Sequence, residues 1–158
     1  MNPLRPGLVS KLARLPGRAA TTLAMRLGRK GFVLNWAKGG AVEQNWGDKL
    51  NPYMAARLAD VPCVHQKEIL PQFGVPVHYW IGSHLGSACG DPNSVVWGAG
   101  FISADTGITG VPGRICAVRG WKSAQRLKEA GIDCPDVVGD AALLLPRLYT
   151  PRRDLARA

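Results

Sequence analysis

The chain has 158 residues, of which 46% are hydrophobic, and its formal net charge is +9. This length and apolar fraction exclude a disordered or coiled-coil chain and predict one domain with a sizeable core. The charge is unevenly placed, because residues 1–31 carry +7, residues 147–158 carry +3 and residues 32–146 carry −1. Since the excess lies at the two ends, it bears on partners and not on the fold.

Hydropathy and cysteine spacing restrict the class of protein further. No stretch reaches the roughly 18 consecutive apolar residues of a membrane span. The apolar window at residues 23–27 contains Arg26 and is too short for a signal peptide, so we expect a cytoplasmic protein. The cysteines show neither CxxC pairs nor the Cys–His spacing of a zinc module. We expect no metal site and four small buried hydrophobic side chains, at Cys63, Cys89, Cys116 and Cys134.

The first 31 residues are predicted to form two short basic amphipathic helices, or one broken helix. Leu8, Leu12 and Leu15 recur at helical spacing among cations, residues 19–27 form a second such stretch, and Pro16 lies between them. Such a segment suits either a solvated arm or peripheral contact with an anionic membrane surface, where lipid-linked sugars are assembled. The basic ends also permit a nucleic-acid-binding module, although no nucleic-acid-binding motif accompanies them.

From residue 31 onward, short apolar runs alternate with turn residues and with two helical stripes. Strands are predicted at residues 31–36, 61–65, 75–81, 94–97, 114–118 and 136–138. Helices are predicted over residues 45–60 and 121–130, the second capped by Gly131, and a last apolar run at 142–145 stops at Pro146. Strands that are apolar on both faces and alternate with helices indicate a parallel sheet. The sequence therefore predicts an α/β, Rossmann-like domain over residues 32–146.

Ligands of such sheets bind beyond the carboxyl ends of the strands. The small or polar residues at those predicted ends are residues 82–84, residues 98–100, Arg119 and Asp140. The glycines from residue 98 onward also resemble the dinucleotide fingerprint G-x-G-x-x-G, but Ser103 replaces the third glycine and turn formers follow where a helix is required. A dinucleotide-binding protein is therefore the weaker alternative.

Three sequence blocks occur in a characteristic order. They are N-W-G-D-x-L-N-P at 45–52, V-R-G-x-x-S-x-x-x-L-x-x-x-G-I at 118–132 and G-D-x-A-L-L-L-P at 139–146. Over residues 33–150 the chain resembles the polysaccharide pyruvyl transferase family. The resemblance implies an enzyme that transfers a pyruvyl group from phosphoenolpyruvate to two hydroxyls of a sugar or lipid-linked oligosaccharide, forming a ketal in exopolysaccharide biosynthesis.

The resemblance also implies how such an enzyme is organised. It predicts a fold similar to one half of a two-domain GT-B transferase, with phosphoenolpyruvate held between two Rossmann-like halves and no further cofactor. Relatives continue into the second half after the block at 139–146. We therefore expect this chain to be an N-terminal half that needs a second Rossmann-like half for activity.

Ketal formation needs a proton donor, a base, and cations that hold a phosphate and a carboxylate. Asp48 is the candidate base or sugar-hydroxyl contact, the alternative being that it only caps a helix. His84 is the candidate donor to a substrate oxygen, the alternative being a structural histidine. Arg119 is the candidate anion ligand at a helix start, unless it forms an ion pair with Asp140.

Further substrate contacts are predicted close to these residues. The asparagines among them have a structural alternative, because asparagine also stabilises turns. The five tryptophans are expected mostly in the core, and a sugar-stacking platform is predicted among them. The remaining candidate contacts are Asn45, Gly47, Asn51, Ser83, Lys122, Ser123 and Asp140.

Overall fold

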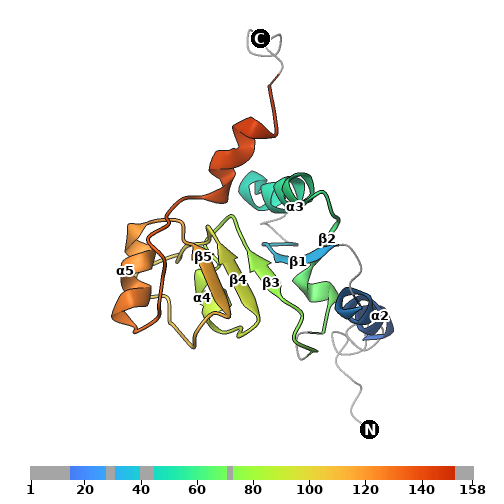
Figure 1. The fold of residues 1–158 in the computed structure, drawn as a ribbon, viewed down its shortest axis with the longest axis horizontal. Helices are drawn as coiled ribbons and strands as arrows, with labels where there is room; N and C mark the ends of the chain where they lie inside the picture. The colour runs from blue at the N-terminus through green and yellow to red at the C-terminus, as the bar shows by residue number, and fades with distance from the viewer. Residues whose placement is uncertain (1–14, 28–30, 40–44, 71–72, 152–158) are drawn as a thin grey trace.

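The sheet has five parallel strands in the order β2-β1-β3-β4-β5 (Figure 1). This computed structural model describes residues 15–27, 31–39, 45–70 and 73–151. The parallel α/β, Rossmann-like fold predicted from the sequence is confirmed. The strands are β1 (Phe32–Asn35), β2 (Cys63–His65), β3 (Val77–Tyr79), β4 (Ser94–Trp97) and β5 (Arg114–Ala117).

The connections between the strands place a topological switch point between β1 and β3. The chain runs from β1 outward to β2 and then returns across β1 to β3, and β1 pairs in parallel with both neighbours. In doubly wound sheets the strand order reverses at such a switch point, and ligands bind beyond the carboxyl ends of the strands there. The ends of β1 and β3, near Asn35 and Tyr79, are paired in register.

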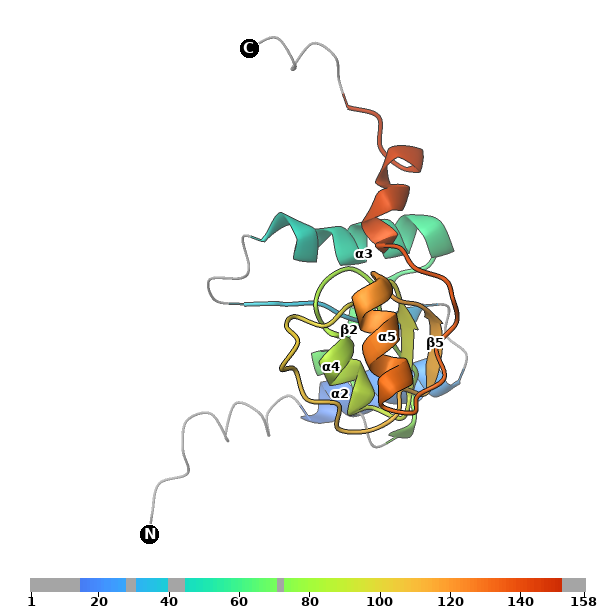
Figure 2. The same cartoon turned by 90° about the vertical axis from the view of Figure 1, so that its left-hand side faces the viewer.

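Two apolar clusters cover the two faces of the sheet, which gives three layers. One face packs α3 (Trp46–Ala59) and the 3-10 helix η4 (Ala141–Arg147) against residues such as Leu34 and Trp80. The other face packs α4 (Leu85–Cys89) and α5 (Trp121–Glu129) around Val33, Val77 and Val96. Figure 2 shows α3 and η4 on one side of the sheet and α4 on the other.

Helix α2 (Leu15–Arg26) closes the edge near β2. The structure describes this helix from Leu15 onward, and the predicted break between it and a preceding helix stays a prediction. Pro16 lies in the first turn of the described helix, where a missing N–H costs no hydrogen bond. Arg18 Nε donates to the Ile69 carbonyl over 3.0 Å, next to the 3-10 helix η2 (Gln66–Glu68). The other predicted basic helix falls within residues 1–14, outside the described residues.

The predicted strands at 75–81 and 136–138 are both longer than the observed ones. Only Val77–Tyr79 forms β3, and residues 136–138 contribute one isolated parallel bridge between Val118 and Val138. Residues 136–138 do not form a full strand because Gly139 and Asp140 turn the chain directly into η4. Pro146 lies inside η4 and does not stop it, since Leu148 N still bonds the Leu145 carbonyl. Gly131, with φ of +74°, follows α5 as predicted.

The cysteines and tryptophans divide between the core and the surface. Cys89 and Cys134 are buried, whereas Cys63 and Cys116 are half-buried, and all four thiols are free. Burial raises the pKa of the Cys63 thiol to about 11, so this side chain stays protonated near neutral pH. Within the described ranges no helix has the length and apolarity needed to cross a bilayer. Trp46 and Trp121 are each 65% exposed.

Candidate functional site at the carboxyl rim

Three helices begin at the carboxyl ends of the strands, and Asn45 sets the start of the first. Its Oδ1 accepts from Gly47 N at 2.9 Å and from Asp48 N at 3.4 Å, which satisfies two free donors of the first turn of α3. The alternative in which Asp48 caps this helix is therefore wrong. The carboxylate of Asp48 is left to point toward the rim.

Asp48 and His84 face each other across the switch point of the sheet. Asp48 Oδ1 accepts from Ala37 N at 3.1 Å, just after β1, and lies 3.5 Å from His84 Nε2, just after β3. The side chains are 12% and 23% exposed, so both are largely shielded and still reachable from solvent. A carboxylate beside an imidazole holds a proton on the facing ring nitrogen and orients the ring. Such a pair can donate and accept protons.

Asn51 fixes the loop that carries His84. It is fully buried, its Oδ1 accepts from Ile81 N at 2.9 Å, and its Nδ2 donates to Ile81 O at 3.0 Å. Both polar groups of the Ile81 backbone are thus paired with one side chain of α3. Asn51 has no exposed surface for a sugar hydroxyl, so it positions the loop and does not touch substrate.

The loop after β3 also depends on Gly82. Its φ is +117°, and a Cβ there would lie 2.9 Å from the His84 ring. Glycine is the residue that adopts this backbone without strain. The backbone is further tied across the rim, because Gly100 N donates to Gly82 O and Arg119 N donates to Ala99 O. The ends of β3, β4 and β5 are therefore held as one unit.

Arg119 reaches back across this unit toward the loop after β3. Its Nη1 donates to Ser83 Oγ and its Nη2 donates to Phe101 O, both over 3.0 Å. Asp140 instead accepts from Ala142 N at 2.9 Å and caps η4, so the predicted Arg119–Asp140 ion pair is absent from the described residues. Gly100 leaves room for the guanidinium, since a Cβ there would lie 2.7 Å from Arg119 Nε.

A groove of about 820 Å³ opens beside Arg119 at the start of α5. Lys122 and Ser123 line it, and Ser123 Oγ accepts from Phe101 N at 3.3 Å. Gly120 is the N-cap without a side-chain cap bond, and the first turn of α5 holds no acidic residue. Free backbone donors, the helix dipole and nearby cations favour an anion at this position.

Arg126 also lines the groove, and the sequence prediction missed it. Its guanidinium donates to the carbonyls of Ser103 and Thr106 and lies 4.3 Å from the centroid of the Phe101 ring. It therefore fastens the loop after β4 onto α5. The available signal was its spacing four residues after Lys122, which places both cations on one face of a helix.

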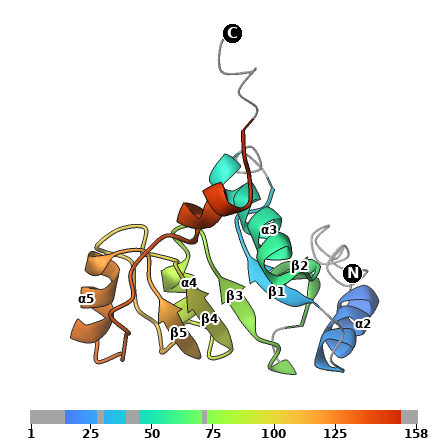
Figure 3. The same cartoon turned by 45° about the horizontal axis from the view of Figure 1, so that its top comes forward.

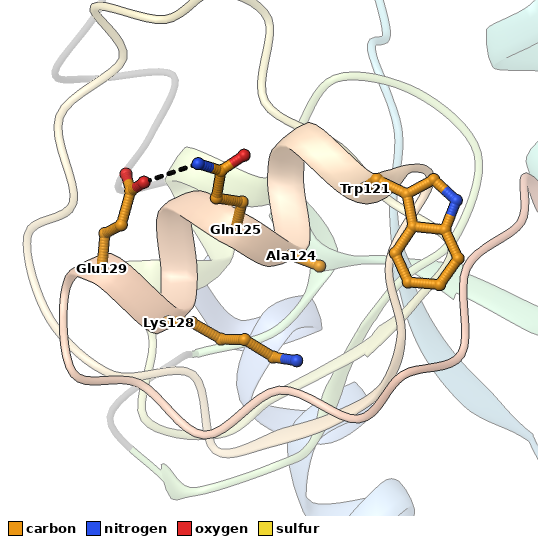
Figure 4. Close-up of a pocket in the computed structure, with 5 residues that line it drawn as sticks. All are labelled: Trp121, Ala124, Gln125, Lys128 and Glu129. Carbon is orange, nitrogen blue, oxygen red and sulfur yellow. Dashed lines mark hydrogen bonds between the residues drawn. The ribbon is translucent and has the colours of Figure 1, made fainter.

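A shallow hollow of about 530 Å³ lies next to this groove along α5 and shares Trp121, Gln125 and Glu129 with it (Figure 4). Its charged groups are already paired: Gln125 Nε2 donates to Glu129 Oε1 over 2.8 Å, and Lys128 Nζ lies 2.6 Å from Asp136 Oδ1. Trp121 stands at one end of the hollow, away from these pairs (Figure 4). No free polar group converges there among the residues drawn, so the candidate site is the carboxyl rim.

The structure separates the predicted site residues into two groups. Asp48, His84, Ser83 and Arg119 form a line along the rim, with adjacent residues 83 and 84 joining the two ends. Gly47 lies in the first turn of α3, and Lys122 and Ser123 lie beside Arg119. The other candidates hold the scaffold, as caps or loop anchors, and these are Asn45, Asn51 and Asp140.

No protein-family model, curated protein or solved structure matched the chain. Among the described residues, no group of three or more His, Cys, Asp or Glu side chains is placed to hold a metal ion.

Proposed function

We propose that the chain is the N-terminal half of a polysaccharide pyruvyl transferase-like enzyme, similar to one half of a GT-B transferase. It transfers a pyruvyl group from phosphoenolpyruvate to two hydroxyls of a sugar. The observation that carries the proposal is the line of Asp48, His84, Ser83 and Arg119 along one carboxyl rim. It supports the proposal because a proton-transfer pair beside an anion site is the combination that ketal formation requires.

The reaction can be written on these groups. One sugar hydroxyl adds to C2 of the enolpyruvyl group while C3 receives a proton, and the hydroxyl loses its own proton to a base. The second hydroxyl then bonds to C2 as the C2–O bond to phosphate breaks, and inorganic phosphate leaves with the second proton. Asp48 is the base for the hydroxyl, and His84, when protonated, is the donor. The two hydroxyl oxygens then form the ketal.

Arg119 and the start of α5 hold the donor. The Arg119 guanidinium donates two of its five N–H groups to Ser83 and Phe101, so three remain to bind a phosphate or carboxylate. Lys122 and the free N–H groups of the first turn add positive potential at the same place. The fixed contacts keep the guanidinium oriented before the donor arrives.

A second Rossmann-like half is part of the proposal, because GT-B-type enzymes hold their donor between two halves. The test supplies the C-terminal half of a polysaccharide pyruvyl transferase to this chain. Phosphate release and the methyl proton signal of a pyruvate ketal are then measured with phosphoenolpyruvate and an oligosaccharide acceptor. Ketal formation that requires both halves, and that disappears in the Asp48→Asn variant, supports the proposal. The proposal is refuted if no ketal forms with any of the C-terminal halves supplied.

Membrane contact and nucleic-acid binding by the two basic ends of the chain stay predictions. Residues 1–14 and 152–158, which carry half of the excess positive charge of the two ends, fall outside the described residues. Peripheral membrane contact through residues 1–31 stays a prediction compatible with a lipid-linked acceptor. Nucleic-acid binding and dinucleotide binding stay the weaker alternatives, and no contact in the described ranges favours either.

A further inference from the structure

An aromatic hollow lies between α3 and η4, and the buried core residue Leu50 forms part of its wall. Trp46, Lys49 and Tyr53 follow one another at helical spacing on one face of α3. Tyr149 and Leu145 close the hollow from η4 and the turn after it, and its volume is about 410 Å³. Figure 3 shows η4 crossing close to α3 at this place.

The polar edges of this hollow are unused within the described part of the chain. The Lys49 ammonium and the hydroxyls of Tyr53 and Tyr149 form no hydrogen bond or ion pair with another described residue. The Trp46 and Tyr149 side chains are 65% and 52% exposed. Arg57 lies 4.0 Å from the centroid of the Tyr53 ring. Aromatic side chains are thus surrounded by donors and acceptors that are free within the described residues.

This combination matches the chemistry of a neutral sugar. A pyranose ring presents C–H groups on its faces, which pack on aromatic rings, and hydroxyls on its rim, which need both donors and acceptors. Tyrosine and tryptophan offer an apolar body with a polar edge, and the lysine adds three donors. The volume falls in the range of small-molecule pockets. A lysine among the lining residues is unfavourable for the core of a protein–protein interface.

We propose that this hollow is a binding subsite for a sugar residue of the acceptor oligosaccharide, with Trp46 as its stacking platform. The inference deepens the proposed function and rests on it for the identity of the acceptor. Asp48 is only two residues beyond Trp46, about 3 Å along the helix axis. Its side chain lies on the opposite side of α3, which is about 10 Å across. The hollow therefore holds a neighbouring sugar of the acceptor, and the reacting sugar lies at the rim.

The test measures saccharide binding to the full chain without any donor. Tetrasaccharides of β-linked glucose and of β-linked galactose are titrated by calorimetry and by saturation-transfer NMR. We expect saturable binding of at least one, weakened about tenfold by Trp46→Ala because a stacking surface is lost. Tyr149→Ala should weaken it in the same direction. Trp121→Ala is the matched control for saccharide binding, because that tryptophan is equally exposed on α5.

Thermal unfolding of each variant shows whether a loss of binding reflects a loss of fold. The inference is overturned if neither tetrasaccharide shows saturable binding. It is also overturned if a folded Trp46→Ala variant binds the tetrasaccharide as well as the unchanged chain does. Binding of a single-stranded oligonucleotide that depends on Trp46, without saccharide binding, also overturns it, since bases stack on aromatic rings as well.

Failure of the subsite and failure of the proposed function give different results. If saccharide binding depends on Trp46 but no supplied half yields a ketal, the reaction is refuted and the subsite remains. If ketals form on a monosaccharide acceptor but saccharides do not bind at Trp46, the subsite is refuted and the reaction remains. Arg119→Ala should abolish ketal formation while leaving tetrasaccharide binding within twofold of the unchanged chain.

Discussion

Replacement of Asn51 by leucine tests whether the rim is held by this one buried side chain. Leucine has a similar volume, so the change leaves no large cavity, but it removes both hydrogen bonds to Ile81. The buried N–H and C=O of Ile81 are then unpaired, at a cost of about 1–3 kcal/mol each. The expected loss is about 2–6 kcal/mol, a large share of the roughly 5–15 kcal/mol that stabilises a typical domain.

Urea unfolding at neutral pH measures this loss. A decrease of about 3 kcal/mol lowers the midpoint by roughly 1–3 M urea. Asn45→Ala is the matched comparison on the same helix, because it removes an exposed cap worth about 1 kcal/mol. If Asn51→Leu destabilises the chain no more than Asn45→Ala does, then Asn51 does not anchor the loop after β3, and the reasoning is refuted.

Three further predictions concern the donor site, the loop and pH. Arg119→Ala should weaken phosphoenolpyruvate binding at least about tenfold, as measured by calorimetry, because charge-assisted hydrogen bonds are lost. Arg114 lies at the other end of β5 and is the control. An equal effect of Arg114→Ala would contradict the assignment of the anion site to Arg119. Gly82→Ala should cost about 1–3 kcal/mol in urea unfolding through its φ of +117°, whereas Gly107→Ala, with nothing within 4 Å, should cost far less. Burial lowers the pKa of His78 below 6.5, so the folded state disfavours its charged form. Stability is then complete above pH 6.5 and falls as the pH drops below it; His78→Phe should reduce that fall in urea unfolding between pH 7.5 and 5.5, and an unchanged slope would contradict the assignment.

The strands and the main helices could be predicted because their signals are local. Val33 and Leu34, or Val95 and Val96, lie in apolar runs without polar alternation, and such runs indicate strands buried on both faces. Helix α5 has a stripe that includes Ala124 and Leu127, followed by a glycine cap. The fold class follows from that alternation, since few arrangements bury runs of this kind.

Other elements were mispredicted because their limits depend on neighbours distant in the sequence. Residues 136–138 have the composition of a strand, but only Val138 finds a partner, at Val118. The pattern of residues around Pro146 predicts a stop, yet η4 continues because its last turn is held by a bond that does not use the proline nitrogen. Propensity describes a segment, whereas pairing is decided by the partner that the fold supplies.

The candidate site shows most clearly the difference between what local sequence determines and what folding decides. The sequence by itself determined which residues lie near the ends of the strands, because hydrophobic runs mark where each strand stops. Only the tertiary structure decided their contacts: Asp48 faces His84 because Asn45 takes over the cap, and Arg119 bonds Ser83 instead of Asp140. The physical reason is that hydrogen bonds need atoms within about 3 Å. Sequence spacing does not specify such distances between segments that meet only after folding.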